Sequence, residues 1–139
     1  MPTARPFSTT ARLHTPTGQQ LPAVWAYDPA DPLAVALHIR SPEPVCWIFA
    51  RDLLHAGLHT RVPVGDGDIR LWTTPTHGNP TQLVIELDSP TGHAHLSTGW
   101  EAVAAFCRRA HTTVPTSRET TLIARQLDHA LTQLQGDAR

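Results

Sequence analysis

The chain has 139 residues, of which 40% are hydrophobic, a formal charge of −1 and no lysine. This length fits one domain over residues 1–139, which buries about two-thirds of the surface of the unfolded chain. Its arginines are scattered and not clustered on one segment, which argues against a nucleic-acid partner because such proteins gather basic residues on one face.

The first ten residues lack the apolar core of a signal peptide, and no stretch approaches the roughly 18 apolar residues of a membrane span. The two cysteines, Cys46 and Cys107, lie inside apolar patterns, where a free thiol behaves as a small hydrophobic group. We therefore expect a cytoplasmic protein with two buried thiols, no disulfide and no membrane insertion.

The first half of the chain predicts four short strands, each bounded by turn residues such as the aspartate–proline pairs after Tyr27. They cover residues 6–14, 21–27, 33–39 and 45–50. In the third strand Val35, Leu37 and Ile39 share one face, so we expect that face to lie in the core.

The fourth strand has two apolar faces, one formed by Val45, Trp47 and Phe49 and the other by Cys46, Ile48 and Ala50. This pattern predicts a strand that is covered on both sides. The second cover is either the protein's own second layer or another subunit, because periodicity does not distinguish the two. A short helix over residues 51–58 follows, and Gly57 is expected to close it in the left-handed conformation.

The second half predicts four more strands, over residues 61–64, 68–74, 82–88 and 92–98. Pro63 makes the first of them an edge strand or an extended loop, and the glycines of residues 65–68 predict a tight turn. Thr98 and Glu101 have capping-box spacing, which predicts the start of a helix that ends at Pro115. Thr116 and Glu119 repeat the spacing and predict a C-terminal helix within residues 116–139.

This order of elements predicts an α+β fold with two antiparallel β-sheets of about 4+4 strands, a short helix between them and C-terminal helices. Ile123, Leu127 and Leu134 follow helical spacing in the last helix. That helix is expected to pack on the protein's own sheet, although the same spacing also fits a short coiled-coil seam.

Catalytic and metal-binding motifs are weak. His93 and His95 share a strand face, and His55 and His59 are four residues apart, yet neither pair has a clear third ligand in the sequence. Glu86 and Asp88 alternate with core positions and are expected to face solvent. No serine nucleophile, phosphate loop or dinucleotide motif is present. The sequence therefore predicts a protein that is not an enzyme and has no metal or cofactor.

Several segments, in unchanged order from Tyr27 to about Glu119, resemble the SsgA-like sporulation and cell-division regulators of filamentous actinomycetes. They are residues 27–35, 45–54, 57–58, 65–72, 85–87, 89–90 and 92–94, with Phe106, Arg108, Arg109, Val114 and Pro115. Residues 73–75 and 116–117 depart from the family pattern, and the first twenty residues match it weakly.

The resemblance implies a non-enzymatic homotrimer on a whirly-like fold that helps to place or remodel septa during sporulation. The implied partners are the division protein FtsZ or another SsgA-like protein, at division septa. Partner contacts depend on a few aromatic or arginine anchors, and we take Trp25, Arg70 and Trp72 as the candidates. The competing hypothesis is a whirly-like module that binds single-stranded nucleic acid, against which the negative charge and missing lysines count.

Overall fold

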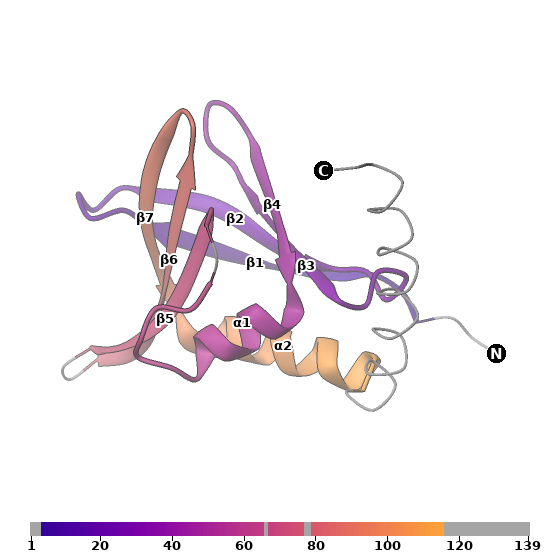
Figure 1. Ribbon diagram of the computed structural model, residues 1–139. Coiled ribbons are helices and arrows are strands. Elements are labelled where there is room, and N and C mark those ends of the chain that lie inside the picture. The colour runs from indigo at the N-terminus through magenta and orange to yellow at the C-terminus, as the bar shows by residue number, and fades with distance from the viewer. Residues whose placement is uncertain (1–3, 66, 77–78, 116–139) are drawn as a thin grey trace, which may run out of the picture.

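The computed structural model describes residues 4–65, 67–76 and 79–115, so the helix predicted within residues 116–139 lies outside the described part. The described residues form seven strands and two helices (Figure 1). The strands are β1 (Phe7–His14), β2 (Gln20–Tyr27), β3 (Ala34–Ile39), β4 (Val45–Ala50), β5 (Ile69–Thr76), β6 (Asn79–Ser89) and β7 (Gly92–Gly99). The helices are α1 (Arg51–Leu58) and α2 (Trp100–Thr113).

The prediction of two separate 4+4 sheets is wrong. All seven strands belong to one curled antiparallel sheet with the order β4-β3-β2-β1-β7-β6-β5. Among the described residues, His14 and Ser97 are the one ladder pair that joins β1–β4 to β5–β7. Figure 1 shows β1 and β2 running across the view, whereas β5, β6 and β7 run steeply. This narrow seam explains the error, because each half has the local pattern of an independent sheet.

One of the eight predicted strands, over residues 61–64, is instead an extended loop in which Val64 alone bridges to Leu71. Pro63 fits this outcome because it cannot donate to a ladder of hydrogen bonds. The turn between this loop and β5 follows the prediction, since Gly65 and Gly67 both have positive φ angles.

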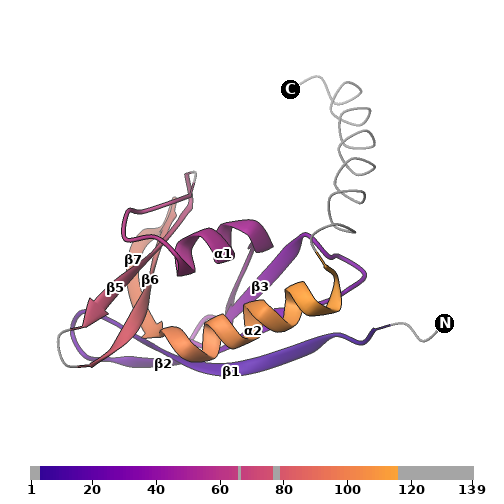
Figure 2. The ribbon, with the colours of Figure 1, turned by 90° about the horizontal axis from the view of Figure 1, so that it is seen from below.

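Both helices cover the inner face of the sheet, as Figures 1 and 2 show. The core is aromatic beneath α2, where the Trp25 ring lies 6.2 Å from both Phe49 and Phe106. The Phe7 ring centroid lies 5.4 Å from that of Tyr27 and 5.5 Å from that of Phe106, so Phe7 belongs to the same aromatic cluster. The inner-face residues of β3 are buried as the alternation predicted.

Strand β4 is an edge strand, not a doubly covered one. Phe49 is buried against the core, but Ile48 is 69% exposed and Cys46 is also exposed. The prediction of cover by the protein's own second layer is thus wrong for this strand, as is the prediction that Cys46 is buried; Cys107 is buried as expected. Cover by another subunit stays a prediction.

The start of α2 also departs from the prediction. Gly99 is the N-cap and no side chain caps the helix, whereas Thr98 is buried at the end of β7. Thr98 belongs to strand β7, where it pairs with Leu83 across the ladder. It is therefore not the N-cap residue, and the capping box does not form. Neither described helix is long and apolar enough to cross a membrane.

The end of α1 depends on two close approaches. Gly57 lies inside the helix without a positive φ angle, so the predicted left-handed closure is wrong. A Cβ atom added there would lie 2.5 Å from Cβ of Leu71, so glycine lets the helix backbone pack directly on β5. The indole nitrogen of Trp100 donates to the Leu58 carbonyl oxygen at 2.7 Å, which satisfies one of the free carbonyls at the helix end.

Gly57→Ala should destabilise the fold. Alanine gains about 1 kcal/mol of helix propensity, but the added methyl pushes α1 away from β5, and overpacking of this kind costs about 1–3 kcal/mol. We expect a net decrease in the free energy of unfolding, measured by urea denaturation. Gly92→Ala is the matched control, because nothing lies within 4 Å of its added Cβ; equal stability of the two variants would contradict the packing argument.

Arg51 connects the first turn of α1 to the end of α2. Its guanidinium is 0% exposed and donates to the carbonyl oxygens of Ala110 and Val114 at 2.8 and 2.9 Å. It also donates to the Tyr27 hydroxyl at 3.2 Å, and that hydroxyl donates to the Pro32 carbonyl. Carbonyls at a helix C-terminus carry partial negative charge, so the cation is placed where it stabilises the helix.

Replacing Arg51 by methionine should lower the free energy of unfolding by about 3 kcal/mol. The change removes charged hydrogen bonds and leaves buried carbonyl oxygens without their donor, and such losses cost about 1–3 kcal/mol per group. Chemical denaturation measures the difference. The exposed Arg40→Met is the control and should stay within about 0.5 kcal/mol of the parent; a similar effect of both variants would show that the buried network is not stabilising.

Candidate functional site

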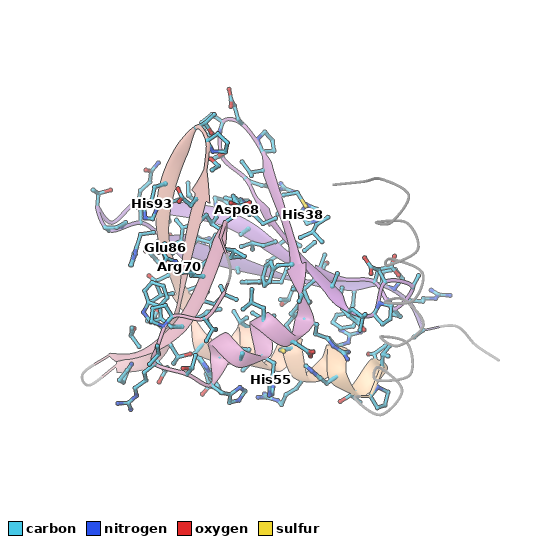
Figure 3. All side chains as sticks on the ribbon, in the orientation of Figure 1. His38, His55, Asp68, Arg70, Glu86 and His93 are labelled. Atoms are coloured by element: carbon cyan, nitrogen blue, oxygen red, sulfur yellow. The ribbon has the colours of Figure 1, made fainter. Side chains whose placement is uncertain are left out.

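The outer surface of the sheet, which the helices leave uncovered, has two faces of different chemistry. The first lies over β5, β6 and β7, and we call it the polar face; its residues are Arg70, Trp72, Glu86, His93 and His95. Alternation along the strands puts these side chains opposite the buried Leu71, Ile85 and Leu96. Figure 3 shows Arg70, Glu86 and His93 close together on this side of the sheet.

Glu86 is the centre of the polar face because the ladder places it between Arg70 and His95. The Arg70 guanidinium lies 2.7 Å from its carboxylate, and nitrogens of His93 and His95 lie at 3.7 and 3.9 Å. The Trp72 ring packs edge-on against His95 at 5.9 Å. An exposed ion pair of this kind contributes about 0–1 kcal/mol, so the face presents these groups and adds little to stability.

The second face lies over β2, β3 and β4, and we call it the apolar face. Its residues are Val24, Ala26, Ala36, Cys46 and Ile48, and the register also places the exposed His38 on it, between Val24 and Cys46. The register aligns Ala26, Ala36 and Ile48 in one row across three strands. The two alanine side chains project little from the sheet, whereas the larger Ile48 side chain is 69% exposed and projects into solvent. A hollow of about 300 Å³ adjoins Ile48, with Phe7 and Ala34 in its wall.

The predicted anchors separate in the structure. Arg70 and Trp72 lie together on the polar face, Arg70 exposed and Trp72 half-buried. Trp25 is 0% exposed and packs between Phe49 and Phe106, so it offers no surface to a partner here. Glu86 and Asp88 point outward as the alternation predicted, Glu86 beside Arg70 and Asp88 near His93. Their negative charges offset the positive charge of Arg70, so this face has no cationic groove.

A third group of chemically active side chains lies between α1 and α2, and the sequence prediction missed it. Ligand-type atoms of His55, Cys107 and His111 all lie within 4.8 Å of one another. The sequence pointed to the His55 and His59 pair but supplied no third ligand. Cys107 and His111 have the same spacing of four on α2, and that repeat is the signal that could have indicated a facing pair.

Comparison with known proteins gives the family. Residues 21–119 match the family described as "Streptomyces sporulation and cell division protein, SsgA". The fold and this match define the class as sporulation and cell-division proteins, which is not a known class of enzymes. The chain belongs to the SsgA family, so the resemblance stated from its motifs is confirmed.

Relatives with this description share much of their length with the chain. It is 43% identical over 102 residues to a sporulation-specific cell division protein of Frankia casuarinae, covering 73% of this chain and 68% of the relative. It is also 43% identical over 101 residues to the sporulation-specific cell division protein SsgB of Streptomyces coelicolor, covering 71% and 72%. These relatives support a role in sporulation septation.

Solved structures support the fold. An SsgB structure, connected with mutations that correlate to longitudinal cell division during sporulation of Streptomyces coelicolor, superimposes with a TM-score of 0.77 at 34% identity. It covers 87% of this chain and 98% of the other. An SsgA-like sporulation-specific cell division protein from Thermobifida fusca has a TM-score of 0.76 at 28% identity, covering 95% and 98%.

Proposed function

We propose that this protein is a non-enzymatic adaptor of sporulation-specific cell division. It acts at the septum by binding FtsZ or a related regulator, and so assists septum placement or remodelling of the septal wall. The observation that carries the proposal is the exposed outer surface of the sheet. It presents an apolar face over β2, β3 and β4 and, beyond β1 in the strand order, a polar face with Trp72 over β5, β6 and β7. A whirly-like fold, which the family resemblance implies, is part of the same proposal.

The apolar face is the contact between copies of the chain in a homotrimer. Its alanines allow a second surface to approach closely, and burying Ile48 removes a large side chain from water, which contributes about 1.5–3 kcal/mol per copy. Strand β4 also presents an edge that no described strand covers, and such edges are a common site of pairing between chains.

The polar face binds the division partner. Trp72 offers a half-buried aromatic surface, and Arg70 offers a planar cation beside it, which are the side chains that dominate the energetics of protein interfaces. Glu86 lies 2.7 Å from the Arg70 guanidinium and favours its outward orientation. A preorganised arginine loses less conformational entropy on binding than a free one.

The alternative, a module that binds single-stranded nucleic acid, has no support from the relatives. Its mechanism requires a cationic groove with aromatic platforms. The polar face instead pairs Arg70 with Glu86 and places Asp88 near His93, with 3.9 Å between the closest oxygen and nitrogen. The mixed charge of this face favours a protein partner.

Substituting Trp72 and Arg70 together by alanine should abolish co-sedimentation with FtsZ polymers, or weaken it by about 30-fold or more, since anchors of this kind contribute about 2 kcal/mol or more. The light-scattering mass should stay unchanged, because the polar face is not the contact between copies. Arg12→Ala, an exposed arginine on β1, is the control and should co-sediment normally. Unaltered binding of the double variant would exclude the polar face as the FtsZ contact.

Ile48→Lys should convert the trimer to a monomer, measured as a threefold lower light-scattering mass, because it places three charges in the contact between copies. Val62→Lys is a matched control, since Val62 is also 69% exposed but lies in the loop before β5. This control should keep the trimer mass. A parent protein that is already monomeric, or an Ile48→Lys variant of unchanged mass, would rule out this face as the trimer contact.

A further inference from the structure

The helix pair on the inner side of the sheet carries a cluster of nitrogen and sulfur ligands that the proposed function does not use. His55 and His59 are four residues apart at the end of α1, and Cys107 and His111 are four apart on α2. Residues at this spacing lie on one side of a helix. Because α1 continues through Gly57, the first pair stays together, with 4.5 Å between the two ring centroids.

The two pairs face each other across the helix contact. The ring centroids of His55 and His111 are 5.2 Å apart, and Cys107 Sγ lies 3.7 Å from His111 Nδ1. Tetrahedral bonds of about 2.0–2.1 Å to nitrogen and 2.3 Å to sulfur place neighbouring ligands about 3.4–3.6 Å apart. The three ligand-type atoms, within 4.8 Å of one another, therefore reach one ion after small side-chain rotations.

Backbone hydrogen bonds hold two of the rings before an ion binds. His111 Nδ1 lies 2.9 Å from the Cys107 carbonyl oxygen, and His59 Nδ1 lies 2.8 Å from the His55 carbonyl oxygen. A carbonyl oxygen only accepts, so Nδ1 carries the proton in each ring. His59 therefore keeps its Nε2 lone pair for a metal, which is the arrangement that orients metal-binding histidines. His111 binds through Nδ1, the nitrogen beside Cys107 Sγ, after the ring proton moves to Nε2.

The surroundings select the kind of ion. A hollow of about 450 Å³ lies over the cluster, and its wall includes all four of these residues. Cys107 is 2% exposed at its base, whereas His55 is exposed. Among the described residues lining this hollow none is a carboxylate. Imidazole and thiolate without carboxylate suit Zn²⁺ and similar transition metals and do not suit Ca²⁺ or Mg²⁺.

We propose that His55, Cys107 and His111 form a binding site for a divalent transition-metal ion of the zinc class. The Cys107 thiol releases its proton to solvent when the ion binds, since the thiolate is the ligand. The fourth position faces the open side of the hollow, where His59 and water are available. The bound ion ties α1 to α2 and stabilises the helix layer, independently of any division partner.

The test is a titration of the purified full chain, kept reduced and metal-free, with Co²⁺ and then with Zn²⁺ as competitor. Binding should saturate at one ion per chain and produce thiolate-to-cobalt absorption, which Zn²⁺ removes. Zn²⁺ should also raise the midpoint of thermal unfolding, because it binds the folded state. A parent chain that gives neither absorption nor a shift of the midpoint would overturn the proposal.

Variants locate the site. Cys107→Ser should eliminate the thiolate absorption and weaken Zn²⁺ binding at least tenfold. Because Cys107 is buried, its variant is first checked for native circular dichroism, and the exposed His55→Asn gives a second measure that should also weaken binding at least tenfold. The control replaces His93 and His95, the other histidine pair, by asparagine and should bind as the parent does. Full binding by a folded His55→Asn variant, or loss of binding in the control, would contradict the assignment.

Discussion

The buried guanidinium of Arg51 is the interaction on which the arrangement of the layers depends. Arg51 directly follows β4 and begins α1, and its side chain holds the last carbonyls of α2 and the hydroxyl of Tyr27 from β2. One side chain therefore joins the edge strand, both helices and an inner strand. A buried cation is costly to desolvate, so the carbonyls must stay in place around it, and the position of α1 on the sheet is fixed.

That fixed helix layer explains why the outer surface is free to serve another purpose. Both helices lie on the inner side of the curled sheet (Figure 2), and the core is complete there, since Trp25, Leu37 and Leu71 are fully buried. The outer residues contribute little to this core. Ile48 can therefore be exposed without loss of the fold, and the chemistry of the outer faces can suit contacts between proteins.

Local pattern predicted much of this fold. The bounds of β4 and α1 agree with the structure, and β1 and β2 agree to within one residue, because alternation and turn residues act over short distances. The joining of the halves at His14 and Ser97 could not be predicted, since a single pair in a ladder has no sequence pattern. The edge position of β4 was missed for a related reason: an apolar face has the same pattern whether it is buried or exposed.

The candidate sites also divide into residues that local pattern predicts and residues that only tertiary contact brings together. Arg70 and Trp72 were found because strand alternation places them on one face, whereas Trp25 lies on the inner face of its strand and is buried by α2 and β4. The cluster of His55, Cys107 and His111 requires two helices, separated by three strands of sequence, to meet side by side. Their meeting depends on Gly57, which lets α1 approach β5, and on Arg51, which holds α2 against α1. Both residues act through tertiary contact, so spacing along the chain alone did not reveal the site.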